Sequence, residues 1–96
     1  MVNSVVLVGR CDSNPFGDTT PKGESTAFFS LRIETAGHVP GRVRISLRGK
    51  AAQIAMDYVK AGMLVGVQGR LVLEACGDGS IEIEATNIRL LGSKAA

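Results

Sequence analysis

The chain has 96 residues, of which 45% are hydrophobic, and this makes one small domain with a core rather than a disordered chain. Its formal net charge of +2 excludes a protein that is basic over its whole surface but permits a local basic patch. No apolar run approaches the length needed to cross a membrane, and no basic leader precedes the first apolar stretch, so we expect a soluble, cytoplasmic protein.

The first third of the chain predicts two strands separated by a loop. Residues 2–9 are apolar on both faces, so this strand should be covered on both, by a barrel interior and by another subunit. Residues 10–22 contain many turn-forming residues and predict a loop. Residues 25–35 predict a second strand, on which Phe28 and Arg32 face outward.

The third predicted strand, residues 42–50, has one apolar face and one basic face. A hairpin loop at residues 36–41 precedes it, and no acidic residue occurs between Glu34 and Asp57 to neutralise its arginines. Arginine binds phosphate through two parallel hydrogen bonds and stacks on bases, so this face is a candidate surface for a polyanion. The alternative is a solvated edge strand whose arginines prevent aggregation. The inward residues are Val43, Ile45 and Leu47, and the outward residues are Arg42, Arg44, Ser46 and Arg48.

The hydrophobic period then changes from that of a strand to that of a helix. Residues 50–61 predict an α-helix, and Gly62 stands where a glycine would end it. A fourth strand over residues 63–74 contains Gly66 and Gly69, and glycines inside a strand indicate a bend or a bulge.

The end of the chain completes an order of three strands, one helix and two strands. A hairpin turn at residues 77–80 leads into a fifth strand over residues 80–91. This order predicts an all-β fold, the five-stranded OB-fold Greek-key barrel with one α-helix between strands 3 and 4. We expect one domain over residues 1–92 and a short disordered C-terminus at residues 93–96. In the fifth strand, Ile81 and Ile83 should face inward, and Glu82 and Glu84 should face outward.

The sequence gives no sign of catalytic or metal-binding chemistry. Cys11 and Cys76 lie far apart, with no CxxC spacing and no histidine beside them, so we expect two reduced thiols and no metal site. His38 is the sole histidine and has no partner near it in the sequence. Glu82 and Glu84 could act as paired carboxylates, but charged outward positions of a strand are the simpler interpretation. We therefore expect a protein that is not an enzyme and uses no cofactor.

Several segments of the chain carry a family resemblance when they are taken together. Two of them are residues 2–10, VNSVVLVGR, and residues 45–62, ISLRGKAAQIAMDYVKAG. Further segments are Asn14-Pro15, residues 20–23, residues 27–31, residues 65–71 and residues 87–92. As a set they resemble the bacterial single-stranded DNA-binding protein family, in which the first segment matches the opening strand and the second matches the third strand and helix.

The chain also departs from the pattern of this family. Arg48 stands where the family has a phenylalanine in strand 3, Arg42 stands near its strand-3 tryptophan, and Cys76 stands near the tryptophan of the strand 4–5 hairpin. The connection between strands 2 and 3 is shorter than usual, and we expect the protein to lack the family's long tail with an acidic tip. Because base stacking contributes about 1–3 kcal/mol per base, the resemblance implies weaker and more salt-sensitive binding than is usual.

The basic face and the resemblance together predict a single-stranded DNA-binding protein without sequence preference, acting at the nucleoid in DNA replication, repair and recombination. The alternative is an assembly factor that mainly docks replication proteins, because the chain also resembles, more distantly, primosomal replication protein n. In both cases we expect a homo-oligomer, either a dimer or a tetramer. The sequence does not distinguish single-stranded DNA from RNA as the ligand. The predicted binding residues are Arg32, Arg42, Arg44 and Arg48, with Lys50 and Arg70 at the margins and Phe28 as a stacking side chain.

Overall fold

The computed structural model describes residues 2–19, 21–34, 36–73 and 81–92, which form six strands and one helix. None of these residues belongs to a helix with the length and apolar character needed to span a lipid bilayer. The strands are β1 (Val5–Cys11), β2 (Phe16–Thr19), β3 (Ser25–Ile33), β4 (Gly41–Arg48), β5 (Leu64–Leu73) and β6 (Ile81–Gly92), and the helix is α1 (Gly49–Tyr58).

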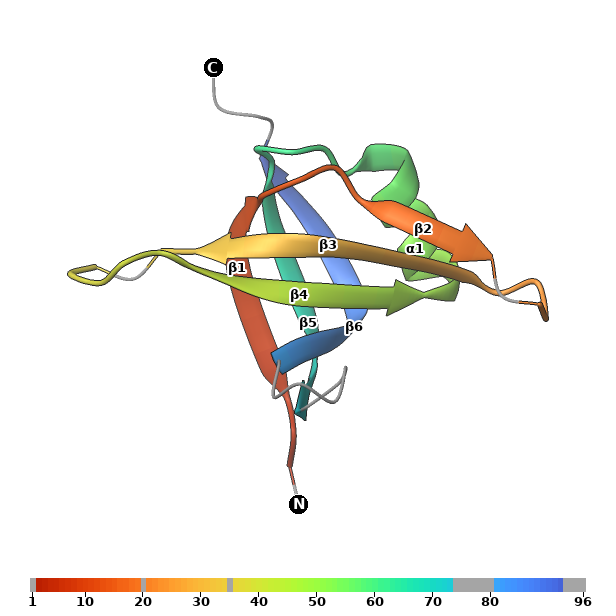
Figure 1. Cartoon of the computed structure of the whole chain (residues 1–96), viewed down its shortest axis with the longest axis horizontal. Coiled ribbons are helices and arrows are strands. Elements are labelled where there is room, and N and C mark those ends of the chain that lie inside the picture. The colour runs from red at the N-terminus through yellow and green to blue at the C-terminus, as the bar shows by residue number, and fades with distance from the viewer. Residues whose placement is uncertain (1, 20, 35, 74–80, 93–96) are drawn as a thin grey trace.

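Five of the strands close into a barrel. The strand order is β1-β5-β6-β4-β3, and a further pairing of β1 with β3 joins the two ends of this order. All of these pairs are antiparallel except β4–β6, which is parallel. The β3–β4 pair crosses in front of β1, β5 and β6 (Figure 1), and α1 packs against β3, β4 and β6. The predicted OB-fold barrel, with one helix between its third and fourth strands, is confirmed.

The prediction of a loop over residues 10–22 is wrong in part, because the end of β1 and all of β2 lie within it. β3 pairs with β4 along one edge, and on its other edge it changes partner along its length (Figure 1). Its first half pairs with β2, starting at Phe16 opposite Phe28, and its second half pairs with β1, with Arg10 opposite Arg32. The stacking of Phe16 on Phe28 helps to hold β2 in place. Such a tertiary contact cannot be read from a segment rich in turn-forming residues.

The side chains of β3 and β4 alternate between the core and the outer surface as the sequence predicts. The apolar set of each strand points inward, and α1 adds Ala52 and Ala55 to the same core. Fully burying an aliphatic or aromatic side chain contributes about 1.5–3 kcal/mol, so this alternation fixes the register of both strands. The largest fully buried hydrophobic side chains are Phe29, Leu31, Ile45, Leu47, Val59, Val65 and Ile83.

α1 ends at Tyr58, before the predicted end of the helix at Ala61. Val59 is already extended, with φ −79° and ψ 133°, and its side chain is fully buried in the core. Gly62, which was predicted to end the helix, has φ 91° in the turn before β5. Its N–H donates to the carbonyl oxygen of Cys11 at 2.7 Å, so this glycine connects the turn to β1.

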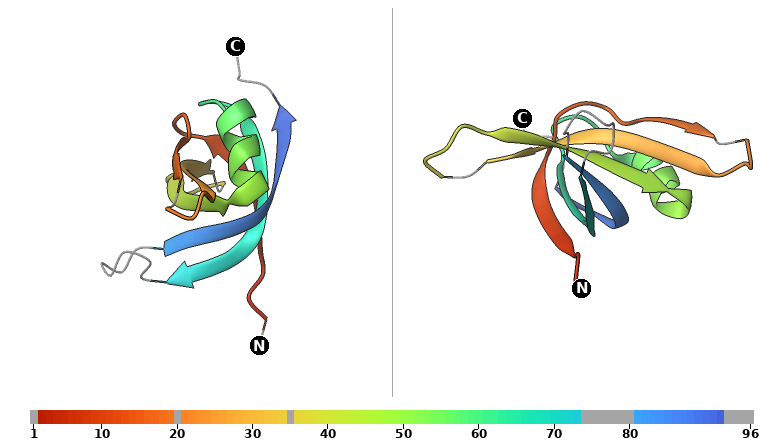
Figure 2. Two further views of the ribbon diagram at one scale, coloured as in Figure 1. Left: turned by 90° about the vertical axis from the view of Figure 1, so that its right-hand side faces the viewer. Right: turned by 60° about the horizontal axis from the view of Figure 1, so that its bottom comes forward.

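The β5–β6 ribbon extends past the core at one end (Figure 2). Ile81 pairs with Leu73 at that end, and their side chains are 51% and 65% exposed. Ile81 shares a face of β6 with Ile83, but it lies past the core and is exposed, whereas Ile83 is buried as predicted. The predicted turn at residues 77–80 and the predicted disordered end at residues 93–96 lie outside the described residues.

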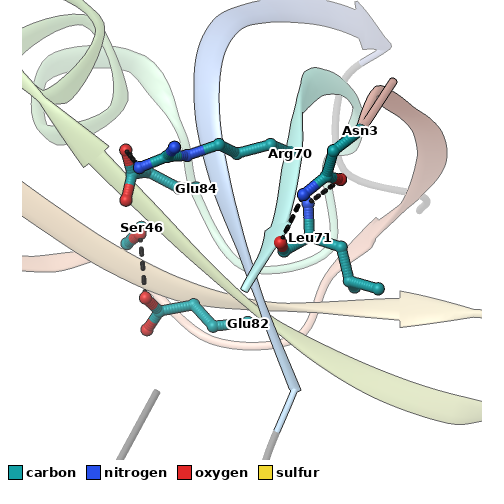
Figure 3. Close-up of polar contacts among 6 residues, drawn as sticks. All are labelled: Asn3, Ser46, Arg70, Leu71, Glu82 and Glu84. Atoms are coloured by element: carbon teal, nitrogen blue, oxygen red, sulfur yellow. Dashed lines mark hydrogen bonds and ion pairs between the residues drawn. The ribbon is translucent and has the colours of Figure 1, made fainter. Parts of the chain in front are cut away.

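The outer face of β1 is apolar, as predicted, and this single chain leaves it uncovered. Val6 and Val8 are 69% and 52% exposed, whereas Leu7 packs against the core from the opposite side of the strand. Before β1, the Asn3 side chain continues the ladder to β5. Its Nδ2 donates to the Leu71 carbonyl oxygen and its Oδ1 accepts from the Leu71 N–H, both at 2.9 Å (Figure 3).

Gly69 lies at a bulge in β5, where the register with β6 shifts, and this confirms the predicted irregularity of the strand. A Cβ added there would lie 2.7 Å from the Cα of Ala85 and would collide with the carbonyl oxygen of Glu84. We predict that Gly69→Ala lowers the free energy of unfolding by about 1–3 kcal/mol, the usual cost of overpacking.

Gly41→Ala is the matched control for this prediction. No atom lies within 4 Å of a Cβ at Gly41, and Gly41 is not among the described glycines with positive φ. This variant should change the free energy of unfolding by less than about 1 kcal/mol. Urea unfolding of both variants measures the difference, and equal losses would contradict the steric explanation.

Candidate nucleic-acid interface

The arginines predicted to bind nucleic acid lie together on the outward side of β3 and β4. Residues paired across two strands lie on the same side of a sheet, so the register of this hairpin decides which side chains are neighbours. Arg32 is opposite Arg42, and Arg44 is opposite Ser30. Phe28 also faces outward, as predicted, and is half-buried. Arg48, opposite Thr26, lies on the same side. We refer to Phe28, Arg32, Arg42, Arg44 and Arg48 as the arginine face.

Carboxylates pair with three of the four arginines of the arginine face, so the expectation of an unneutralised basic strand is wrong. The sequence between Glu34 and Asp57 is free of acids, but the β4–β6 pairing brings Glu82 to this surface, Asp12 reaches it from the end of β1, and Glu34 lies two residues from Arg32. Such exposed ion pairs contribute about 0–1 kcal/mol each and are weakened by salt. The contacts are Arg42 Nε to Asp12 Oδ2 at 2.7 Å, Arg44 Nε to Glu82 Oε1 at 3.2 Å, and Arg32 Nη2 to Glu34 Oε1 at 3.5 Å.

Glu82 and Glu84 both bind arginines on the outer surface. The Glu82 side chain is 15% exposed, and its second oxygen, Oε2, accepts from Ser46 Oγ at 3.2 Å (Figure 3). Glu84 Oε1 accepts from Arg70 Nη2 at 3.1 Å (Figure 3). The two glutamates thus point outward as predicted and are held by Arg44, Arg70 and Ser46.

Lys50 and Arg70 lie at the margins of the arginine face, and Arg48 lies at its end nearest α1. Arg70 on β5 is opposite Glu84 on β6, which is opposite Ser46 on β4, which is opposite Phe28 on β3. This row of strand partners connects Arg70 to the arginine face. Arg48 ends β4, and Lys50 is exposed in the first turn of α1. Within the described residues, neither Arg48 nor Lys50 forms an ion pair.

Phe28 is in contact with a second aromatic ring and with a guanidinium group. The ring centroids of Phe28 and Phe16 are 5.6 Å apart, with an interplanar angle of 27°. The Cζ atom of Arg44 lies 4.7 Å from the centroid of the Phe28 ring. Sequence reasoning missed Phe16 because it placed this residue in a loop. A large apolar side chain among turn-forming residues was the available signal.

Arg10 is a second residue of this surface that sequence reasoning missed. It is opposite Arg32 across β1–β3, and Arg32 is opposite Arg42 across β3–β4, so three arginines form one row across three strands. Arg10 Nη1 donates to the carbonyl oxygen of Gly62 at 3.2 Å. Continuing the alternation of β1 beyond its predicted end would have placed Arg10 on the outer side.

The described thiol and the histidine do not form a reactive pair. Cys11 is a free cysteine in the core, and its Sγ donates to the carbonyl oxygen of Ser13 at 2.8 Å. Burial raises the pKa of the Cys11 thiol and the charge of Asp12 adds to this shift, so the thiol stays protonated at neutral pH. His38 is exposed in the β3–β4 connection, and Cys76 lies outside the described residues. In the described part of the chain, no three His, Cys, Asp or Glu side chains cluster as metal ligands would.

Comparison with known sequences identifies a family and individual relatives. The family described as the single-strand binding protein family matches residues 2–91. "Single-stranded DNA-binding protein 1" of Synechocystis sp. is 34% identical over an alignment of 104 residues, which covers 97% of this chain and 86% of that protein. A protein of the same name from Staphylococcus aureus is 36% identical over 77 residues, which cover 74% of this chain and 46% of that protein.

Two solved structures have the same fold. The SSB domain of a Synechococcus sp. protein superposes with a TM-score of 0.81 at 20% identity and covers 93% of this chain and 96% of that one. A deletion mutant of the single-stranded DNA binding protein from Thermus aquaticus gives a TM-score of 0.83 at 20% identity, over 99% of this chain and 43% of that one. These structures support the OB-fold, and the family match extends over almost the whole sequence. The chain belongs to the single-strand binding protein family.

Proposed function

We propose that the protein binds single-stranded DNA, without sequence preference, mainly through the arginine face. The observation that carries this proposal is the β3–β4 register, which sets four arginines and one aromatic ring on one outward surface of an OB-fold. The family match and relatives named single-stranded DNA-binding protein support the choice of ligand. Lys50 and Arg70 extend this surface at its margins.

In this mechanism, phosphate groups of the strand take the place of carboxylates as partners of the arginines. Breaking an exposed ion pair such as Arg42–Asp12 costs about 0–1 kcal/mol, and the guanidinium group then binds phosphate through two parallel hydrogen bonds. Each phosphate that is neutralised releases counterions, so affinity falls as salt rises. Contacts to phosphate carry no sequence information, and this accounts for binding without sequence preference.

The second candidate function is the docking of replication proteins, as in primosomal replication protein n. The relatives described above are named for binding single-stranded DNA, and this favours nucleic-acid binding as the primary activity. We infer a binding function rather than a catalytic one, at the DNA of the cytoplasmic nucleoid during replication, repair and recombination. Replication or repair proteins would then be partners of the complex with DNA, and RNA would be a competing ligand.

A titration with labelled oligo-dT at several salt concentrations tests the proposal. We predict that the logarithm of the affinity falls with the logarithm of the salt concentration at about 0.7 per phosphate contacted. Arg48→Gln should reduce this slope by about one contact, because the described residues give Arg48 no carboxylate partner.

Lys60→Gln removes the same charge outside the arginine face and should leave the slope unchanged. A slope near zero for the unmodified protein would rule out the electrostatic mechanism. A parallel titration with oligo-U compares RNA with DNA. Tighter binding of oligo-U would show that RNA is the preferred ligand.

Releasing Arg42 from its carboxylate should strengthen binding. Asp12→Asn keeps the shape of the side chain and removes the negative charge that lies 2.7 Å from Arg42 Nε. We predict an affinity for oligo-dT that is about two- to fivefold higher at low salt, with a smaller gain at high salt, where charges are screened.

Asp57→Asn on α1 is the matched control, because it changes the net charge equally without touching the arginine face. Fluorescence titration of both variants gives the comparison. Equal gains in both would mean that net charge, and not the release of Arg42, controls affinity.

We further propose that the protein is a homo-oligomer, either a dimer or a tetramer, assembled through β1. β1 pairs with β5 over residues 5–10 but with β3 only at Arg10 and Cys11, so within the described chain most of β1 has one free edge. The exposed side chains of Val6 and Val8 lie on the same strand. A free edge and an apolar outer face together favour pairing with a second copy.

Light scattering tests this assembly. We predict a mass that is a multiple of 10.0 kDa at micromolar concentration, and a shift towards the monomer in Val8→Lys. Val39→Lys, at a site that is 91% exposed in the β3–β4 connection, is the matched control and should not change the mass. A monomer mass for the unmodified protein throughout this range would overturn the proposal.

A further inference from the structure

A hollow at one side of the arginine face is lined by three phenylalanines, which phosphate groups would not bind. It measures about 150 Å³ and opens to the surface where β2 lies against β3. Aromatic rings, a guanidinium group and hydroxyl groups all contribute to it, and this combination suits a flat molecule with polar edges. Its lining residues are Ser13, Phe16, Phe28, Phe29, Ser30 and Arg44.

We propose that this hollow holds one base of the bound strand, stacked against the exposed ring of Phe16. The inference rests on the single-strand binding proposed above and assigns the place where a base, rather than a phosphate, is held. The ligand class is a nucleobase in a flexible strand, because only an unpaired base can leave its neighbours and present a free face to a side chain.

The geometry around Phe28 prepares Phe16 for this role. Phe28 is half-buried and already packs against Phe16 and Arg44, at 5.6 Å and 4.7 Å respectively. Phe16 is 61% exposed, so it retains free ring surface. Because Phe16 is opposite Phe28 in the β2–β3 ladder, the backbone holds the two rings together before any ligand binds. A platform that is ordered in advance loses little conformational entropy on binding.

Arg44 contributes to the hollow mainly through the flat face of its guanidinium group, which packs on the Phe28 ring. Its Nε is held by Glu82 at 3.2 Å, and its Cζ lies over the Phe28 ring, so the guanidinium group is oriented on two sides. Glu82 is in turn fixed by Ser46 at 3.2 Å. Arg44 therefore supports the ring that supports Phe16, and it forms one wall of the hollow.

The polar part of the lining fits a base of any identity. Ser13 and Ser30 lie at the hollow, and a hydroxyl group can either donate or accept a hydrogen bond. Such groups satisfy the edge of a base without selecting one base over another. This agrees with a strand-binding protein that has no sequence preference.

The competing explanation is that Phe16 serves only to attach β2 to β3. Phe16→Leu distinguishes the two explanations, because leucine keeps an apolar side chain against Phe28 but has no ring to stack on a base. The experiment measures the affinity of each variant for oligo-dT and for an abasic strand of equal length, which has the same phosphates and no bases. Thermal unfolding confirms that each variant is folded.

For the unmodified protein we expect tighter binding of oligo-dT than of the abasic strand. Phe16→Leu should lower the affinity for oligo-dT by about fivefold or more, which is the low end of stacking with one base, and should leave the abasic strand unaffected. Phe16→Tyr retains the ring and should bind both strands as the unmodified protein does. Arg48→Gln should weaken both strands equally, because it removes a phosphate contact.

The outcomes separate this inference from the proposed function. Equal binding of both strands by the unmodified protein would overturn the stacking site while leaving phosphate binding intact. Equal weakening of both strands by Phe16→Leu would show that Phe16 has only a structural role. If Phe16→Leu does not fold, Phe16→Met replaces it under the same two criteria, because methionine also keeps an apolar side chain against Phe28 and has no ring. Failure to bind either strand at low salt would overturn the proposed function itself.

Discussion

The antiparallel pairing of β3 with β4 is the constraint on which the rest of the molecule depends. Its register runs without interruption from Thr26 opposite Arg48 to Ile33 opposite Gly41. With that register, every apolar residue of β4 points into the barrel and its arginines point outward. A slip of one residue would reverse both sets and bury guanidinium groups without partners, at a cost of several kcal/mol each. The register that buries the apolar residues of β4 therefore also places its arginines on the outer surface.

The barrel also determines how strong the electrostatic field of this surface can be. β6 pairs with β4 in parallel and carries Glu82 to Arg44, while the end of β1 leads Asp12 to Arg42. Arg32, Arg42 and Arg44 are thus already partnered in the free protein, and a phosphate that binds one of them gains only the difference between two favourable interactions. Binding that depended on charge alone would be weak. A stacking contact at Phe16 would add a contribution that salt does not screen.

Much of the architecture could be predicted from the sequence, because alternation along β3, β4 and β6 is a local property of the chain. β2 could not, because Gly17 and Asp18 favour turns and the strand depends on a ring contact with Phe28. The end of α1 was misplaced because burial of Val59, and not the glycine at position 62, decides where the helix stops. Tertiary packing overrode the local signal in both places.

The ion pairs of the arginine face were also beyond sequence reasoning. Whether Glu82 meets Arg44 depends on the register between β4 and β6, which are far apart in the chain. Outward alternation on each strand can be predicted separately, but which outward residues become neighbours follows from closing the barrel. The same reason applies to Arg10: alternation along β1 could place it on the outer side, but only barrel closure sets it in one row with Arg32 and Arg42.

The location of the strand on the protein is the central claim, and amide chemical-shift mapping tests it most directly. ¹⁵N-labelled protein titrated with oligo-dT should show its largest shifts at β3, β4 and Phe16, including Ser30 and Arg44, with small shifts in α1. Shifts confined to α1 or to the outer face of β1 around Val6, with β3 and β4 unchanged, would contradict the account.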